Sequence, residues 1–370
     1  MQRWARFVVL ITISGIVLGA CRPETPSPGP TIQPTASDPV ATSPSGVPTP
    51  AASASAPVPT RAVSWTMLPS ASDGPTRREG HSWTVDPSSA VAYLFGGLGV
   101  DGFLGDLWAF DMTADAWEQL APVGPTPSSR AGHVGVWMDG IGLVVFAGRD
   151  AAGPSSELWA YDPGANGWRI LATTGDGPAA RTDACGAIGP DGRLWVSHGE
   201  GGEGAYLDDV WVFDPAASVW AETDAAGVGP SPRAGSACWW SSTDGLMLYG
   251  GRSSTDEVLG DAWALDSRSA TGWVPGPGFP PPGRAFTASA TSSSAAYLLG
   301  GAGRGDALLG ELLAHDLSSR TTERLAAGSE APDPRSDAAL VDDPEGERVL
   351  LFGGRDAAGP TDALWSVSPP

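Results

Sequence analysis

Six arginines recur along the chain at nearly constant spacing, each as the last residue of a Pro-x-x-Arg motif. Successive members lie 52, 51, 52, 51 and 51 residues apart: Arg78, Arg130, Arg181, Arg233, Arg284 and Arg335. A guanidinium group can bind a carboxylate through two parallel hydrogen bonds. Gathered in space, the six could therefore recognise an acidic sugar or a carboxylate-bearing peptide. They could instead pair with carboxylates of neighbouring repeats and hold the repeats together.

Other residues repeat in the same register as the arginines. A Gly pair, or a remnant of one, follows each arginine: Gly96-Gly97, Ala147-Gly148, His198-Gly199, Gly250-Gly251, Gly300-Gly301 and Gly353-Gly354. Tryptophans form two further series: Trp108, Trp159, Trp211, Trp263 and Trp365, and Trp117, Trp168, Trp220 and Trp273. A period near 50 residues indicates a repeat architecture.

The second repeat shows the local pattern best. Arg130 to Met138 is predicted as a strand, and Asp139-Gly140 is a hairpin signal. The apolar run 141–147 is typical of a strand buried on both faces, and shorter strands are expected at 158–161 and 168–171. Four short antiparallel strands in each repeat correspond to one blade of a β-propeller, so the predicted fold class is all-β.

The combined motifs resemble the kelch-repeat family. The resemblance is carried by Arg130-x-Gly-His133, the Gly pairs, Trp159-x-Tyr-Asp162 and Trp117-x-x-Leu120, and covers about residues 63–370. It implies a kelch β-propeller of the galactose-oxidase-like type with four antiparallel strands in each blade, and the six repeats predict six blades. In kelch propellers the first strand of a blade is innermost, so the six arginines are expected around one mouth of the central channel.

Repeat six ends after its third strand, at Trp365 to Val367, whereas an orphan strand with the Trp-x-x-Leu signature lies at Trp65 to Leu68. We therefore expect Trp65–Leu68 to complete blade six and to close the ring. A closed ring of blades avoids an exposed sheet edge with unpaired backbone groups.

The beginning of the chain is predicted to lie outside the fold. Residues 1–21 have a basic start, an apolar run of 12 residues and the ending Leu18-Gly19-Ala20-Cys21, which resembles a bacterial lipobox with Cys21 as the lipidation site. Residues 22–61 are rich in Pro, Ser, Thr and Ala and are predicted to form a disordered tether, which leaves 62–370 for the propeller. These features predict a membrane-anchored extracytoplasmic lipoprotein, in the envelope, the periplasm or at the cell surface.

Composition limits the partners. The formal net charge is −21 and lysine is absent, so nucleic-acid binding is not expected. The favoured function is a monomeric binding module for a protein or a glycan. The alternative is a carbohydrate-active enzyme, similar to kelch sugar mutarotases, with its site at the arginine-lined channel mouth.

Catalytic and metal-binding residues are not predicted. His81, His133, His198 and His315 all occupy positions of the repeat motif, and no Cys-Tyr and His set matches the copper site of galactose oxidase. We therefore expect no metal and no cofactor. Trp137 and Trp240 lie outside the repeated Trp positions and could stack on sugars or pack between blades. Cys185 and Cys238, in the first strands of adjacent repeats, either face each other as a disulfide or point apart.

Overall fold

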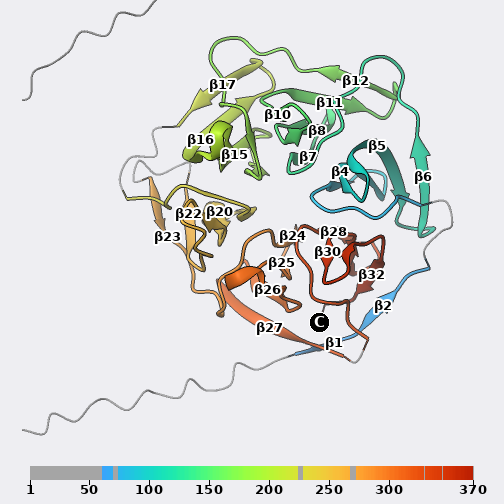
Figure 1. Cartoon of the computed structure of the whole chain (residues 1–370), viewed down its shortest axis with the longest axis vertical. Coiled ribbons are helices and arrows are strands. Elements are labelled where there is room, and N and C mark those ends of the chain that lie inside the picture. The colour runs from blue at the N-terminus through green and yellow to red at the C-terminus, as the bar shows by residue number, and fades with distance from the viewer. Residues whose placement is uncertain are drawn as a thin grey trace, which may run out of the picture. The chain divides into compact units, whose positions relative to one another are not determined.

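The computed structural model describes residues 61–69, 74–223, 228–266, 272–328, 330–343 and 345–369. The predicted signal peptide, Cys21 and all of the tether except Arg61 lie outside the described residues. The repeats form six antiparallel sheets that follow one another around a ring in chain order (Figure 1). The prediction of a six-bladed β-propeller is therefore confirmed.

Each blade has four main strands, numbered outwards from the channel. Blade one contains β3 (Ser82–Asp86), β4 (Val91–Gly99), β5 (Gly102–Asp111) and β6 (Ala116–Leu120). Blade two contains β7 (Val134–Met138), β8 (Gly142–Phe146), β11 (Leu158–Asp162) and β12 (Gly167–Ile170). Blade three contains β14 (Cys185–Ile188), β15 (Leu194–Gly201), β16 (Tyr206–Asp214) and β17 (Val219–Glu222).

The second half of the ring follows the same order. Blade four contains β19 (Ala237–Ser241), β20 (Gly245–Tyr249), β22 (Ala262–Leu265) and β23 (Trp273–Pro275). Blade five contains β24 (Ala288–Thr291), β25 (Ala295–Leu299), β26 (Leu312–Asp316) and β27 (Thr321–Ala327). Blade six contains β28 (Ala339–Asp343), β29 (Arg348–Phe352), β32 (Leu364–Val367) and, as its fourth strand, β2 (Trp65–Met67).

Short elements lie in the connections between the main strands. They are β1 (Ala62–Val63), β9 (Arg149–Asp150), β10 (Gly153–Pro154), β13 (Arg181–Thr182), β18 (Arg233–Ala234), β21 (Arg252–Ser253), β30 (Arg355–Asp356), β31 (Gly359–Pro360) and the 3-10 helices η1 (Gly202–Gly204) and η2 (Arg304–Asp306). Within the described ranges, no helix is long and apolar enough to cross a membrane.

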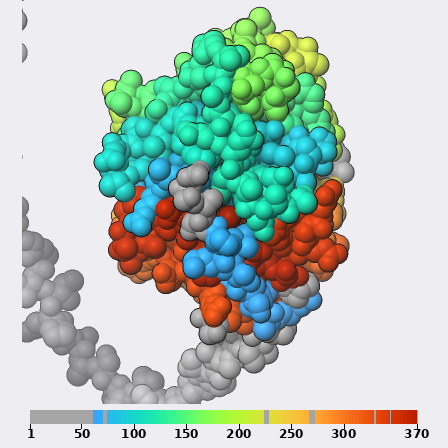
Figure 2. Space-filling model, turned by 90° about the vertical axis from the view of Figure 1, so that its right-hand side faces the viewer, coloured from blue at the N-terminus to red at the C-terminus, as the bar shows by residue number. Residues whose placement is uncertain are grey.

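The ring closes through the N-terminal strand, as the sequence predicts. Trp65 of β2 pairs with Val367 of β32, and Met67 pairs with Trp365, in antiparallel register. In addition, β1 pairs in parallel with the outer strand β27 of blade five. The N-terminal strands therefore lie against the last two blades (Figure 2).

The repeated residues explain how the blades pack. The second strand of each blade is almost wholly buried, which accounts for its apolar run. The tryptophan of the fourth strand reaches the phenylalanine of the preceding blade's second strand, with ring centroids 5.0 Å apart for Trp168 and Phe95 and also for Trp220 and Phe146. The fourth-strand tryptophan series is thus an inter-blade contact.

Candidate binding site in the central channel

The six repeated arginines lie inside the blades. Their exposed fractions are between 0 and 3%, and they precede the innermost strands, since β7 begins at Val134, four residues after Arg130. The prediction that they line a channel mouth is therefore wrong, although Arg181 and Arg233 do begin short strands, β13 and β18, that precede the innermost strands. Their side chains are directed into the blade, where backbone and carboxylate acceptors surround them.

Arg181 illustrates the arrangement. Its Nη1 donates a hydrogen bond to the carbonyl oxygen of His198 at 3.0 Å, and Nη1 and Nη2 each donate to one oxygen of Asp209 at 2.7 Å. Trp211 Nε1 donates to the same carboxylate at 2.8 Å. The guanidinium therefore connects the segment before the inner strand to the second and third strands of the same blade.

Five blades share this ion pair. The nitrogen–oxygen distances are 2.7 Å for Arg78–Asp106, 2.5 Å for Arg130–Glu157, 2.7 Å for Arg181–Asp209, 2.7 Å for Arg233–Asp261 and 3.0 Å for Arg284–Glu311. Each carboxylate belongs to the arginine's own blade. The sequence-based alternative, in which the arginines pair with neighbouring blades, therefore has the right chemistry but the wrong blade.

Blade six lacks this carboxylate. The acidic residue stands two positions before the third-strand Trp or Leu in the other five blades, but Ala363 occupies that position before Trp365. Arg335 donates instead to the carbonyl oxygens of Asp333 and Gly353, each at 3.0 Å. Burial lowers the pKa of Arg335 below its ordinary value.

The ion pairs are electrostatically favourable. Burial alone would raise the pKa of Asp209, but hydrogen bonds and charge from Arg181 lower it below its ordinary value. In the same way, burial is outweighed by Arg78 at Asp106 and by Arg233 at Asp261, so the pKa of each acid is lowered. Because the guanidiniums are buried and bound by acceptors of their own blades, they do not supply the open arginine-lined site on which the ligand-binding and sugar-enzyme hypotheses depend.

One end of the channel is narrowed by backbone. We call it the narrow end and define it by the residues two positions after each arginine: Gly80, Gly132, Asp183, Gly235, Phe286 and Asp337. The N–H of each donates to the carbonyl oxygen of the equivalent residue in the preceding blade, at 2.7–2.9 Å, and Gly80 closes the circle by donating to Asp337. A continuous ring of six hydrogen bonds therefore joins all six blades.

This ring requires an unusual backbone conformation. All six residues have positive φ, between +52° and +68°, and only Gly adopts such angles without strain. Nevertheless, Asp183, Phe286 and Asp337 occupy three of the positions. Burial, with the neighbouring carboxylates Glu200 and Asp183 respectively, raises the pKa of Asp183 to about 6 and that of Asp337 to about 7. The narrow end therefore carries two acids whose pKa is raised above the ordinary value.

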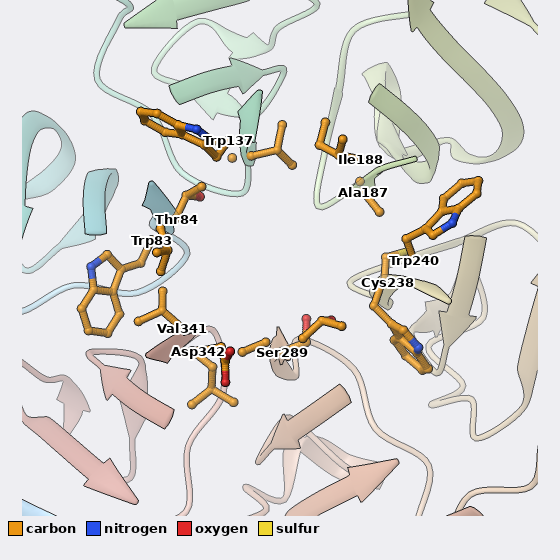
Figure 3. A pocket seen from close by; sticks show the side chains of 18 of the residues that line it. Trp83, Thr84, Trp137, Ala187, Ile188, Cys238, Trp240, Ser289, Val341 and Asp342 are labelled. Atoms are coloured by element: carbon orange, nitrogen blue, oxygen red, sulfur yellow. The ribbon is translucent and has the colours of Figure 1, made fainter. Parts of the chain in front are cut away.

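The opposite end contains the larger cavity. We call it the wide end and define it by the residues seven positions after each arginine: Val85, Trp137, Ile188, Trp240, Thr291 and Asp342. The cavity has a volume of about 490 Å³ and is lined by the innermost strands of all six blades. Figure 3 shows its labelled side chains around an open centre. This size falls in the range of ligand-binding pockets.

The lining of the wide end is largely apolar, with one acid. Val136, Ala187 and Val341 contribute apolar surface, and Thr84 and Ser289 contribute hydroxyl groups. Burial, followed by the nearby Asp343 charge, raises the pKa of Asp342 to about 6. Sequence reasoning missed Asp342, although it is the only acidic residue in the seventh position after the arginines.

The two unassigned tryptophans lie at the wide end. Trp137 stacks on Tyr93 of blade one, with ring centroids 5.6 Å apart and 10° between the ring planes. Trp240 contacts Trp195 of blade three at 5.6 Å. The structure therefore shows the inter-blade packing that was one of the two alternatives. Both side chains nevertheless remain partly exposed and line the cavity.

Cys185 of β14 and Cys238 of β19 form a disulfide between blades three and four, with Cα atoms 5.5 Å apart. Cys238 also lines the wide-end cavity.

The four histidines are buried, and burial favours the neutral form of the imidazole. Burial lowers the pKa of each, to about 3 for His133 and His198. His133 Nε2 is hydrogen-bonded to Ser82 Oγ of the preceding blade at 2.9 Å. In the described part of the chain, no group of three or more His, Cys, Asp or Glu residues is placed to hold a metal ion.

Comparison with known proteins agrees with this architecture. Residues 57–245, about half of the chain, match the family described as the KLHDC2/KLHL20/DRC7 Kelch-repeats domain. The chain is 29% identical over 249 residues to serine/threonine-protein phosphatase BSL2 of Arabidopsis thaliana, covering 63% of this chain and 23% of that protein. It is also 29% identical over 192 residues to Kelch domain-containing protein 3 of Homo sapiens, covering 48% and 50% respectively. The chain thus spans half or less of the length of these relatives. Its repeats, its blades and this match together show that the chain belongs to the Kelch-repeat family.

Proposed function

We propose that this chain is a lipid-anchored extracytoplasmic protein whose propeller, as a single copy, binds another protein at the wide end. Kelch propellers typically act as protein-interaction modules. The observation that carries the proposal is the open, largely apolar cavity to which all six innermost strands contribute. Partly exposed Trp137 and Trp240 lie in its lining, and aromatic residues are enriched at protein interfaces.

The location outside the cytoplasm is supported by two independent features. The lipobox-like sequence ending in Cys21 predicts an anchor, and residues 22–61 have the composition of a spacer between membrane and domain. The Cys185–Cys238 disulfide is of the kind that persists in oxidising compartments. Closure of the ring by the chain's own β2 supports a monomer, because no second chain is needed to complete blade six.

A site-specific photo-crosslinking amino acid would test the binding face. It would replace Thr291, which is exposed at the wide end, and in a control it would replace Ile170, which is 58% exposed on the outer strand β12. In cells that express the full chain, the Thr291 position should give adducts of discrete protein mass, and the Ile170 position should not. Adducts of equal yield from both positions, or adducts that only glycosidases remove, would contradict a protein partner at the wide end.

The anchor is tested separately. A Cys21→Ser variant should move from the membrane fraction to the soluble fraction. Retention of Cys21→Ser in the membrane would contradict lipid anchoring at this residue.

A further inference from the structure

We propose that the wide end captures a basic side chain, an arginine or a lysine of the partner protein, with the Asp342 carboxylate as its counter-ion. This inference rests on the proposed function and specifies the chemistry by which the partner would be recognised.

Asp342 differs from the acid beside it in having no ionic partner among the described residues. The Asp343 carboxylate accepts a hydrogen bond from Arg348 Nε at 2.8 Å and another from the Gly346 N–H at 3.0 Å. By contrast, within the described ranges, no arginine or histidine lies within ion-pair distance of Asp342. The acid at the cavity is thus available to a cation from outside.

Among the described residues that line the cavity, Asp342 is also the only one with a charged side chain. The five equivalent positions around the wide end hold Val, Trp, Ile, Trp and Thr. A single carboxylate in an apolar, partly dehydrated setting interacts more strongly with a cation than it would in bulk water. A bound anion would instead be repelled by this carboxylate.

The shape of the cavity suits a long basic side chain. The aliphatic part of Arg or Lys can lie along apolar surface such as Val136 and Ile188 while its charged end reaches a carboxylate. Trp137 and Trp240 are partly exposed in the same lining and can add cation–π contacts. A volume of about 490 Å³ has room for such a side chain.

The charge of the whole chain favours the same class of partner. With 42 acidic and 21 basic residues, its long-range field attracts cationic surfaces and increases their rate of encounter. The chain has no lysine, and five of its six repeated arginines are held in buried ion pairs. An external basic side chain is therefore the best match for Asp342.

Peptide binding to the purified full chain in detergent would test the inference. The probe is the blocked peptide Gly-Ser-Arg-Ser-Gly, and its control carries citrulline, which is neutral and nearly isosteric, in place of Arg. Tryptophan fluorescence at pH 7.5 would report binding, since Trp137 and Trp240 line the cavity. We expect the Arg peptide to bind at least tenfold more tightly than the citrulline peptide.

The decisive variant is Asp342→Asn, which should weaken binding of the Arg peptide about tenfold and leave the citrulline peptide unaffected. Asp101→Asn, which removes one exposed carboxylate from the β4–β5 turn, should leave both affinities unchanged. Equal binding of both peptides, or equal binding by wild type and Asp342→Asn, would overturn the inference. Free arginine binding as tightly as the peptide would also overturn it, because the site would then recognise a small molecule.

The failure of this inference can be distinguished from failure of the proposed function. If Asp342→Asn keeps the protein adducts formed through Thr291, the wide end binds a partner but not through a cation. If the adducts are absent from the wild-type protein, the binding face itself is misplaced.

Discussion

The two ends of the central channel are built from the innermost strands and from the segments that precede them, and they differ in what faces the channel. At the narrow end, six backbone N–H groups are consumed in a closed ring of hydrogen bonds between blades. At the wide end the side chains determine the surface, which is a largely apolar cavity with one acid that has no ionic partner among the described residues. The narrow end therefore stabilises the ring, whereas the side chains of the wide end can differ according to the ligand that they bind.

The difference arises from local backbone conformation. Positive φ two residues after each arginine allows the backbone N–H to reach the neighbouring blade. Seven residues after the arginine, the chain lies at or beside the end of an antiparallel strand, where residues such as Trp137 and Trp240 are in register with the second strand. Substitutions at the two ends should consequently have different effects, and four comparisons test this.

The largest loss of stability is expected from removing an acid that pairs with a buried arginine. Asp209→Ala leaves the fully buried Arg181 without its carboxylate, and breaking a buried ion pair in this way costs about 3–5 kcal/mol. Because the Asp209 side chain is 23% exposed, water can offset part of this cost, and we expect a value near the lower limit. Urea-induced unfolding at pH 7.5 would measure it.

The matched variant at the wide end is Asp342→Ala. Since no described cation pairs with Asp342, removing the carboxylate should cost no stability, and because its pKa is raised to about 6, loss of the charge should if anything increase the free energy of unfolding at pH 7.5. A large loss of stability in Asp342→Ala would show that this acid has a structural role, and the contrast between the two ends would fail.

The second comparison concerns the disulfide that joins blades three and four near the wide end. Its cysteines are 53 residues apart, and crosslinks of such span stabilise proteins by about 2–4 kcal/mol. The double variant Cys185→Ala/Cys238→Ala should therefore lower the unfolding free energy by about that amount.

A control for the disulfide is the addition of reductant, which should destabilise the wild type but not the double variant. If reductant left the melting temperature and the intact mass of the alkylated wild type unchanged, the two thiols would not be bonded in solution.

Much of the architecture could be predicted because it depends on periodic local signals. The Gly pairs, the Trp series and the fourth-strand signature at Trp65 determine blade number and ring closure, and all act through neighbouring strands. The burial of the arginines was harder to predict from the sequence. Its signal is an Asp or Glu two residues before the third-strand Trp or Leu, and this pattern has meaning only once the strands are paired.

The wide-end site could not be predicted for a different physical reason. Asp342 becomes distinctive only because the equivalent positions of five other blades are neutral and lie around one cavity. Ligand sites of repeat proteins depend on such departures from the repeat, whereas periodic motifs report the scaffold.

The third comparison uses two glycines with similar backbone angles. Gly132 at the narrow end has a φ of +65°, and a Cβ there would lie 2.3 Å from Thr182 Oγ1 and 2.4 Å from Asp183 Oδ1. Gly140, in the β7–β8 turn next to the wide end, has a φ of +74° with open space around it. Gly140→Ala should cost about 1 kcal/mol from backbone strain alone.

Gly132→Ala should cost about 2 kcal/mol, because the ring and the Asp183 side chain must also shift. Thermal unfolding of the two variants side by side would measure the difference. Equal costs would indicate that the hydrogen-bond ring adapts freely, and the narrow end would then not be the more rigid of the two.

The fourth comparison concerns the pH dependence that the narrow end imposes on stability. The folded state raises the pKa of Asp337 to about 7 from an ordinary value of 3.8, so between these pH values the folded chain retains a proton that the unfolded chain has released. The free energy of unfolding should therefore decrease as the pH rises from about 4 to 7 and then level off. Asp337→Asn mimics the protonated acid, and should be nearly equal to wild type in stability at pH 4 but more stable at pH 8, by up to about 4 kcal/mol at about 1.4 kcal/mol for each unit of pKa shift. Asp101→Asn serves as the control for removing one carboxylate. A wild-type stability advantage at pH 8 would mean that ionised Asp337 has a favourable contact within the fold, and the narrow end would then not impose the expected pH dependence.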